Sequence, residues 1–359
     1  MSAELISNII SQGQRLATHS WEYGTFAEAL LEWYNPSSSV FGNNTFPDGK
    51  IPVLQVDSTQ SLSYVKPHIS TDSDTLVDGD GAAGDPASLG VSAILIGQTE
   101  SDFLSAADRQ VQHLLNSVPR WSNGAISHRE SVAELWADFI YMAPPTLAYW
   151  AIQSDDEGLL NTAIQQCSLY QQVLGVPSDA QSAAGLWHHI VGPQSQDLGI
   201  WSTGNGWAAA GMSRVLATAK KSRFAGNGGT SGAITQLKNI IRSILDGAIA
   251  RDNAEPNEPL LRNYLNDTTW FAELSGTTLL TATAYRMAQL EPADFGNNYI
   301  SWADSKRQAI TDKISSDGLL SPVINPLNWK DKTPATESPE AQSFAVLMFA
   351  AHRDFTSGH

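Results

Sequence analysis

Apolar residues recur along most of this chain with the spacing of amphipathic helices, and the strict alternation typical of strands is scarce. Clusters of Gly, Pro and small polar residues separate the helical stretches. The pattern therefore predicts an all-α protein. The expected helices cover residues 3–18, 24–34, 86–97, 101–117, 131–152, 155–174, 206–222, 231–251, 270–290, 297–315 and 337–353.

The predicted helices come in pairs joined by short polar turns, such as residues 97–100 and 153–156. Repeated helical hairpins build either an open α-solenoid or a closed double ring of helices. The sequence has no fixed-period repeat of the tetratricopeptide or ankyrin kind, which favours the closed ring. A chain of 359 residues could form two domains, but no linker divides it, so we expect one domain over residues 1–359.

Three long segments lack helical periodicity, and loops of this length in a compact domain usually carry function. They are residues 35–84, 176–204 and 317–336.

One predicted helix carries an acid among apolar residues. Ser131 followed by Glu134 is a capping-box pattern, which would start the helix there and place Asp138 in its interior. Flanked by Trp136 and Phe139, the carboxyl would be partly desolvated, so we expect a raised pKa and a proton held near neutral pH. Asp138 is therefore the leading candidate for a general acid. The alternative is an Asp on a solvent face or hydrogen-bonded to a loop.

Asp85 is a candidate for a second carboxylate in the same site. Asp85-Pro86 opens a predicted helix, and helix capping alone would explain both residues. If the fold brings Asp85 beside Asp138, the two charges would push one pKa upward and help Asp138 to remain protonated. The acid-rich segment 72–85 lacks the acid spacing of an EF-hand, and we expect no metal site there.

The segment 185–207 combines histidine, tryptophan and glycine. A histidine of the pair His188-His189 could donate a hydrogen bond to a sugar hydroxyl, and the alternative is a surface pair without function. No further ligand at zinc-binding spacing lies nearby. The run from Trp201 to Trp207 could form a stacking platform ahead of a helix, although Gly-Asn-Gly is also an ordinary turn.

Charge argues against several classes of partner. The formal net charge is −16, and no Lys/Arg block interleaved with aromatic residues is present, so neither nucleic acid nor an anionic membrane is expected as a partner. Eleven Trp would suit carbohydrate stacking, although Trp is also common core material. No Walker loop, dinucleotide fingerprint or Gly-x-Ser-x-Gly elbow appears, which argues against nucleotide chemistry.

Cys167 is the single cysteine, so it can form no intrachain disulfide and no Cys-based metal site. We expect a buried, inert thiol.

The sequence contains no run of 18 apolar residues, so it predicts no membrane span. We expect an extracellular protein, with Met1 in place of a removed signal peptide; a cytoplasmic location is the alternative.

Several of these segments, in their order along the chain, resemble the unsaturated uronyl hydrolases of glycoside hydrolase families 88 and 105. Residues 136–145, Trp-Ala-Asp-Phe-Ile-Tyr-Met-Ala-Pro-Pro, resemble the family's Trp-x-Asp-x-x-Phe-Met-x-x-Pro segment, whose Asp is the catalytic acid. Residues 85–90 resemble the Asp-x-x-x-x-Gly segment with the second acid, and residues 185–189 the Gly-Leu-aromatic-x-His segment. Residues 201–207 and 273–277 resemble the Trp-x-Arg-Gly-x-Gly-Trp and Glu-Thr-Ser-Gly-Thr blocks.

This resemblance implies a closed (α/α)6 barrel of six helical hairpins with its site at one open end. It implies Asp138 as acid and base and Asp85 as its assistant, with neither a metal nor an organic cofactor. The substrate would be an oligosaccharide that ends in a 4,5-unsaturated uronic acid, and the reaction a hydration of the C4=C5 enol ether. We expect the protein to work as a monomer. The substrate-binding residues implied or suggested by these segments are His189 rather than His188, Trp207, Trp201, Thr203, Asn205, Trp136 and Trp21.

Thr203 departs from the family pattern, because family members often carry Arg at that position. Thr cannot offer a bidentate cationic fork to a carboxylate. Ser202, Thr203 and Asn205 could instead bind a uronate through neutral hydrogen bonds, or the site could accept another leaving sugar. Two further functions therefore stay open: a glycosidase or lyase on saturated uronate-containing glycans, and a carbohydrate-binding barrel without catalysis.

Overall fold

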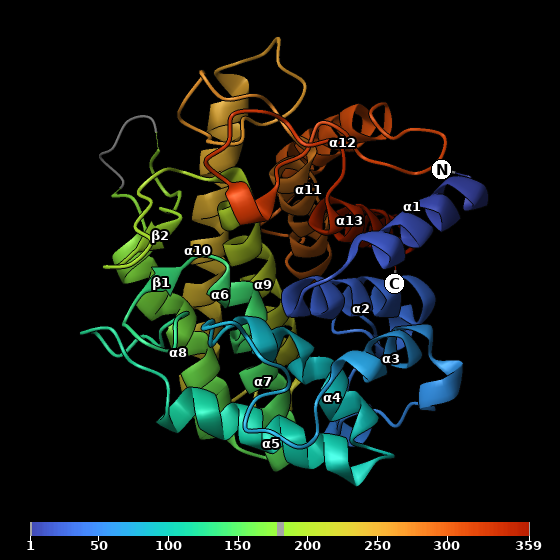
Figure 1. The fold of residues 1–359 in the computed structure, drawn as a ribbon, viewed down its shortest axis with the longest axis vertical. Helices are drawn as coiled ribbons and strands as arrows, with labels where there is room; N and C mark the ends of the chain where they lie inside the picture. The colour runs from blue at the N-terminus through green and yellow to red at the C-terminus, as the bar shows by residue number, and fades with distance from the viewer. Residues whose placement is uncertain (1, 178–182, 359) are drawn as a thin grey trace.

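The computed structural model describes residues 2–177 and 183–358, and helices dominate it (Figure 1). The all-α prediction is confirmed. Two short strands, β1 (Leu135–Trp136) and β2 (Ile190–Val191), form an antiparallel ribbon. The helices are α1 (Ala3–Leu16), α2 (Ser20–Tyr34), α3 (Gln60–Val65), α4 (Gly90–Ile96), α5 (Ser101–Asn116), α6 (Phe139–Met142), α7 (Pro144–Ser154), α8 (Glu157–Leu174), α9 (Ser202–Lys221), α10 (Gly228–Asn253), α11 (Leu274–Leu290), α12 (Asn297–Thr311) and α13 (Pro339–Ser357).

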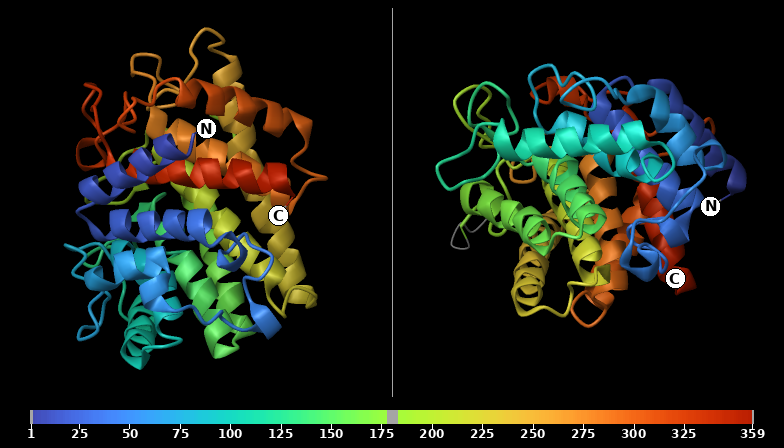
Figure 2. Two further views of the ribbon diagram at one scale, coloured as in Figure 1. Left: turned by 90° about the vertical axis from the view of Figure 1, so that its right-hand side faces the viewer. Right: turned by 90° about the horizontal axis from the view of Figure 1, so that it is seen from below.

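Alternate helices form two concentric layers. The inner helices are α2, α4, α7, α9, α11 and α13; each packs against the next, and α13 returns to α2 to close the ring. The outer helices are α1, α3, α5, α8, α10 and α12. Seen from below in Figure 2, the colours run round the molecule until the last helix lies beside the first ones. The described part of the chain is thus an (α/α)6 barrel, as expected from the family resemblance.

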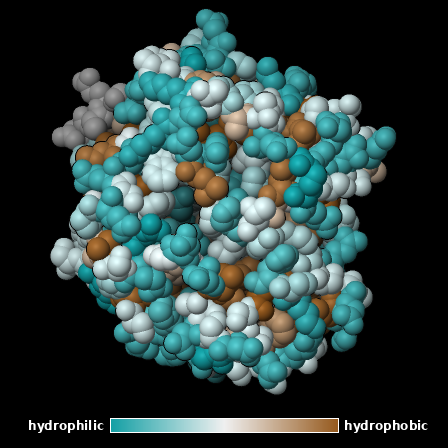
Figure 3. All heavy atoms as spheres, in the orientation of Figure 1, coloured by the Kyte–Doolittle hydropathy of each residue, from teal (hydrophilic) through white to brown (hydrophobic). Residues whose placement is uncertain are grey.

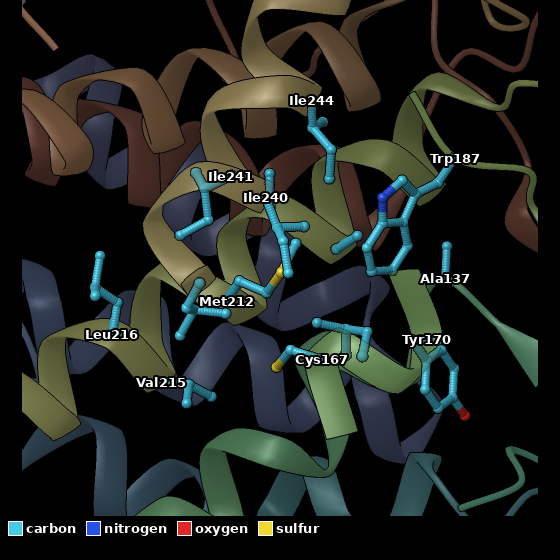
Figure 4. Packing of buried hydrophobic residues seen from close by; sticks show 14 of the residues in the cluster. Ala137, Cys167, Tyr170, Trp187, Met212, Val215, Leu216, Ile240, Ile241 and Ile244 are labelled. Atoms are coloured by element: carbon cyan, nitrogen blue, oxygen red, sulfur yellow. The ribbon is translucent and has the colours of Figure 1, made fainter. Parts of the chain in front are cut away.

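The apolar faces of the two layers form the core. In Figure 4, side chains of α8, α9 and α10 interdigitate around Cys167, Met212 and Ile241, all of which are fully buried. Burying a side chain of this size stabilises the fold by roughly 1.5–3 kcal/mol. Burial also raises the pKa of the Cys167 thiol, as predicted for an inert cysteine. No described helix is long and apolar enough to cross a bilayer.

The helix predicted over residues 131–152 is wrong in its first part. Residues 131–138 form turns and the strand β1, and the helix α6 begins only at Phe139. Asp138 is the N-cap residue of α6 and does not lie inside a helix.

Contacts with a distant loop replace the predicted capping box. The Glu134 carboxylate accepts hydrogen bonds from the backbone amides of Gln194 and Ser195, each at 2.7 Å. The backbone amide of Ala137 donates to the His189 carbonyl oxygen at 2.9 Å. These long-range bonds outweigh the local helix propensity, and they bring the residue after Ala137 close to an imidazole.

The segments predicted to be irregular are shorter than expected. Residues 35–84 contain α3 and several turns of 3-10 helix. The 3-10 segment η5 (Asp85–Leu89) runs directly into α4, so the helix predicted over 86–97 exists with a tighter first turn. The prediction for 176–204 falls partly on residues 178–182, which lie outside the described residues.

Candidate active site

A cavity of about 220 Å3 opens at one end of the barrel. Figure 3 shows this face hollowed to the left of its centre, between the β1–β2 ribbon and the 3-10 segment η6 (Pro326–Asn328) of Figure 1. Helix N-termini carry a partial positive charge, so this end favours acidic groups and anionic ligands. Four cavity-lining residues lie in or just before the first turns of inner helices or of the short α6: Trp21, Asp138, Trp201 and Glu340. Asp85 opens the 3-10 segment η5 that leads into α4.

Asp138 and His189 face one another in the cavity wall. Asp138 Oδ2 lies 3.5 Å from His189 Nε2 and has no closer hydrogen-bond partner. Burial alone would lower the pKa of His189, but the nearby carboxylates of Asp138 and Asp197 outweigh burial and raise it. The two carboxylates therefore favour the charged form of the imidazole.

Asp85 lies in the same cavity and is coupled to Asp138. Burial, together with the charge of Asp138, raises the pKa of Asp85 to about 7, although Arg129 opposes the shift. Asp85 Oδ1 is 3.6 Å from Nε2 of His128, whose pKa burial lowers to about 4, so that ring is neutral at neutral pH. Asp85 can therefore hold a proton near neutral pH in the same cavity as Asp138.

Arg129 supplies a cation without an acidic partner. Its guanidinium lies 5.4 Å from the Trp136 ring centre, where it gains from cation–π attraction. Among residues 2–177 and 183–358, no carboxylate lies within ion-pair distance of Arg129 and its side chain makes no hydrogen bond. In a protein with a net charge of −16, an unpaired arginine in a cavity is suited to bind an anionic group of a ligand.

The opposite wall carries a buried acid. Glu340 is 2% exposed; its Oε1 accepts a hydrogen bond of 2.9 Å from the Trp21 indole, and its Oε2 has no partner. Burial, with the charges of Asp138 and Glu22, raises the pKa of Glu340 well above its usual range. Trp21 also stacks on His19, with 4.6 Å between ring centres.

The structure brings six of the predicted site residues to the cavity: Asp138, Asp85, His189, Trp136, Trp201 and Trp21. Its choice between the two histidines agrees with the prediction, because His189 lines the cavity and His188 points its Nδ1 at the Leu198 carbonyl oxygen.

Three predicted substrate-binding residues do not reach the cavity, and this corrects the sequence-based placement. Thr203, Asn205 and Trp207 lie fully buried in α9. The Asn205 amide bonds the backbone of Trp187 at 2.8 and 3.0 Å, so it serves loop structure. Trp207 packs edge-on against Phe344, with 4.7 Å between ring centres. These three positions of α9 therefore belong to the protein core and not to the cavity wall.

Sequence reasoning missed His128, Arg129, Trp329 and Glu340 as cavity residues. Trp329 lies in the long segment 317–336, whose length did indicate function, with its ring 5.5 Å from that of Trp136. The other three gave no distinctive motif. Within the described residues, no group of three or more His, Cys, Asp or Glu side chains could hold a metal ion.

Solved structures with the same fold are numerous. A possible member of glycoside hydrolase family 105 from Salmonella enterica serovar Paratyphi A has a TM-score of 0.73 at 16% identity, over 97% of this chain and 92% of that one. A family 105 glycoside hydrolase from C. acetobutylicum has a TM-score of 0.73 at 13% identity, over 98% of each chain. An unsaturated glucuronyl hydrolase specific for heparin has a TM-score of 0.65 at 10% identity, over 99% and 98%. Identities this low indicate the fold alone.

No curated protein sequence matches the chain significantly. Residues 8–244 match the sequence profile of Glycosyl Hydrolase Family 88, which is more than half of the chain. The cavity with its coupled acids lies in the barrel that this family shares with its structural neighbours, and the chain therefore belongs to glycosyl hydrolase family 88 and is a glycoside hydrolase.

Proposed function

We propose that this protein removes a terminal 4,5-unsaturated uronic acid from oligosaccharides that a polysaccharide lyase has produced. The observation that carries the proposal is the cavity itself, in which two carboxyls, one of them able to hold a proton near neutral pH, line the same wall as an arginine without an ion-pair partner. The pair supplies acid–base chemistry, and the arginine suits the carboxylate of a uronic acid. The named activity of the heparin-specific neighbour is consistent with this substrate class.

The reaction begins at the double bond. Asp138 donates its proton to C4, and the positive charge that develops at C5 is stabilised by the ring oxygen. Asp138, now a carboxylate, takes a proton from the water that adds to C5. The product is a hemiketal, which opens and releases the remaining sugar. Asp85 assists because it can hold a proton near neutral pH in the same cavity.

Arg129 can bind the substrate carboxylate in place of the arginine that the family pattern has at position 203. Thr203, which stands at that position, is buried in α9 and cannot contact a ligand in the cavity. Arg129 reaches the cavity from the loop before β1 and lies over Trp136. We therefore place the uronate carboxylate at Arg129.

The extracellular location and the monomeric state stay predictions.

The test of the reaction class is the ultraviolet absorbance of the conjugated C4=C5 bond. Unsaturated disaccharides from pectin, glucuronan, ulvan and glycosaminoglycans would be compared with their saturated counterparts, with Asp138→Asn as the control enzyme. Loss of absorbance with the native enzyme alone would support the proposal. Turnover of a saturated substrate would favour a glycosidase or lyase, and binding without any turnover a carbohydrate-binding barrel.

Arg129→Gln tests the position of the carboxylate. Loss of a charged hydrogen bond is worth about 1.5–3 kcal/mol, so KM should rise roughly 10–100-fold while kcat changes little. Arg120→Gln is the matched control, since Arg120 is exposed and bonds only the backbone oxygens of Gly124 and Leu115. Equal KM values for both variants would place the carboxylate elsewhere.

A further inference from the structure

His189 lies between two carboxylates on opposite sides of its ring. Its Nε2 is 3.5 Å from Asp138 Oδ2 in the cavity, and its Nδ1 is 3.0 Å from Asp197 Oδ2 behind the cavity wall. A neutral imidazole has one nitrogen without a proton, and that nitrogen would face a carboxylate oxygen, lone pair against lone pair. His189 is 1% exposed, so solvent cannot relieve such a contact. The imidazolium satisfies both sides in either protonation state of Asp138, whereas a neutral ring does so only while Asp138 directs its own proton at Nε2.

Asp197 does not line the cavity, and its surroundings keep it charged. Its Oδ2 accepts a hydrogen bond from the Tyr264 hydroxyl, and its Oδ1 accepts one of 2.9 Å from the backbone amide of Gly199. Partial burial opposes ionisation, but the hydrogen bonds with His189 and Tyr264 hold the pKa of Asp197 well below its usual range. Asp197 is therefore a permanent anion behind the ring.

The backbone holds these groups in place. Asp197 and Ile190 exchange two backbone hydrogen bonds, at 2.8 and 3.0 Å, which fix Asp197 across the loop from the residue after His189. Tyr264 packs directly on Gly199, where a Cβ would come within 2.1 Å of the phenol ring. Tyr264 is itself only 6% exposed. Side chains held this way keep a fixed geometry, which a catalytic constellation requires.

We propose that Asp197 and Tyr264 are positioning residues of the active site, which fix His189 as an imidazolium with its Nε2–H directed at Asp138. This inference rests on the proposed function. When Asp138 gives its proton to C4, the new carboxylate lies 3.5 Å from a cation that is already in place. When Asp138 takes a proton from the attacking water, its charge disappears again. His189 keeps both of its ring protons throughout, so the protons balance.

The direct test is the protonation state of His189 in the free protein. The charged and titratable groups around the ring are Asp138, Asp197 and, farther away, His128. Asp197→Asn keeps the shape of the side chain and removes the charge. In a nitrogen-15 NMR titration of the imidazole, we expect the variant to lower the pKa of His189. An unchanged His189 titration would overturn the proposal.

Kinetics then test whether this charge matters for turnover. Asp197→Asn should lower kcat about 10–100-fold at neutral pH, the size of effect of one preorganised electrostatic group, with KM nearly unchanged. The alkaline limb of the kcat profile should move to lower pH, because His189 loses its proton earlier. Tyr264→Phe should shift the same limb by less. A purely structural role would lower kcat at all pH values without moving the limb, and that result would also overturn the proposal.

Asp267→Asn is the matched control, because Asp267 lies three residues after Tyr264, its side chain bonds only Thr269, and it does not line the cavity. It should leave the His189 titration and the kcat profile as in the native protein.

The two proposals fail in different ways. A native protein without activity on any unsaturated disaccharide would remove the proposed function, whereas the NMR titration would still decide whether Asp197 fixes the charge of His189.

Discussion

Two of the places where the described part of the barrel buries charge differ in how the charges are paired. We call the first the interior ion cluster; it consists of Glu28, Glu32, Arg214, Arg286 and Asp354. There, Arg286 pairs with Glu32 at 2.6 Å and with Asp354 at 2.8 Å, and Arg214 pairs with Glu28 at 2.5 Å. The second place is the cavity. Along α2, Trp21 of the cavity and Glu28 of the cluster are separated by roughly 10 Å, at 1.5 Å of rise per residue.

In the interior ion cluster every carboxylate has a guanidinium partner, although Arg286 Nε makes no hydrogen bond, whereas the cavity leaves carboxyl oxygens without partners. Asp138 Oδ2, His189 Nε2 and Glu340 Oε2 make no hydrogen bond. A buried polar atom without a partner costs about 1–3 kcal/mol. The comparison indicates that the cluster serves stability, while the cavity gives up stability for groups that act on a substrate.

Asp138→Asn should have the largest effect on activity. A general acid–base residue contributes about 10²–10⁴-fold to the rate, so kcat on an unsaturated disaccharide should fall by that factor. The thermal midpoint should stay equal or rise, because the variant removes a carboxyl from a site that does not satisfy it. If Asp138→Asn is less stable than the native protein but keeps more than a tenth of its kcat, Asp138 serves stability and not catalysis, and the comparison is wrong.

Arg286→Met should have the largest effect on stability. It leaves Glu32 and Asp354 buried with fewer partners, and breaking a buried ion pair in this way costs about 3–5 kcal/mol. Denaturant unfolding would measure the loss, and kcat per folded molecule should stay native. Arg15→Met is the control, because Arg15 forms an exposed pair with Glu337 that should contribute about 1 kcal/mol or less. Equal losses for both variants would contradict a stabilising role of the cluster.

Glu340→Gln should have the smallest effect, and it depends on pH. A free Glu titrates near pH 4.3, while the folded protein keeps Glu340 protonated to higher pH. The native protein therefore has its full stability below about pH 4 and loses some as pH rises toward the raised pKa of Glu340. Each unit of raised pKa corresponds to about 1.4 kcal/mol. Gln cannot ionise, so the variant should be more stable than the native protein between about pH 5 and 8.

Thermal midpoints across this pH range would measure the effect. Glu4→Gln provides the control, since Glu4 is exposed on α1. A pH dependence that is the same in the native protein and in Glu340→Gln would show that Glu340 ionises freely in the folded state.

Local patterns predicted the helical architecture well. Outer helices such as α5, α8 and α12 pack an apolar face against the inner layer, so their apolar spacing and end signals predict them to within a few residues. The same local reasoning failed at Ser131, where a capping-box pattern exists without a helix. The reason is that Glu134 finds backbone amides sixty residues away, which no local pattern reveals.

The sequence by itself determined the all-α class, the hairpin order and, through the family resemblance, the candidates Asp138, Asp85 and His189. Only the tertiary structure decided which side chains meet. It placed Thr203, which lies in a family motif, in the core, and Arg129, which lies in none, at the cavity. It also set Asp197 and Tyr264 behind His189. The physical reason is that periodicity records which face of a helix is apolar, whereas a site depends on distances between segments that come together only when the ring closes.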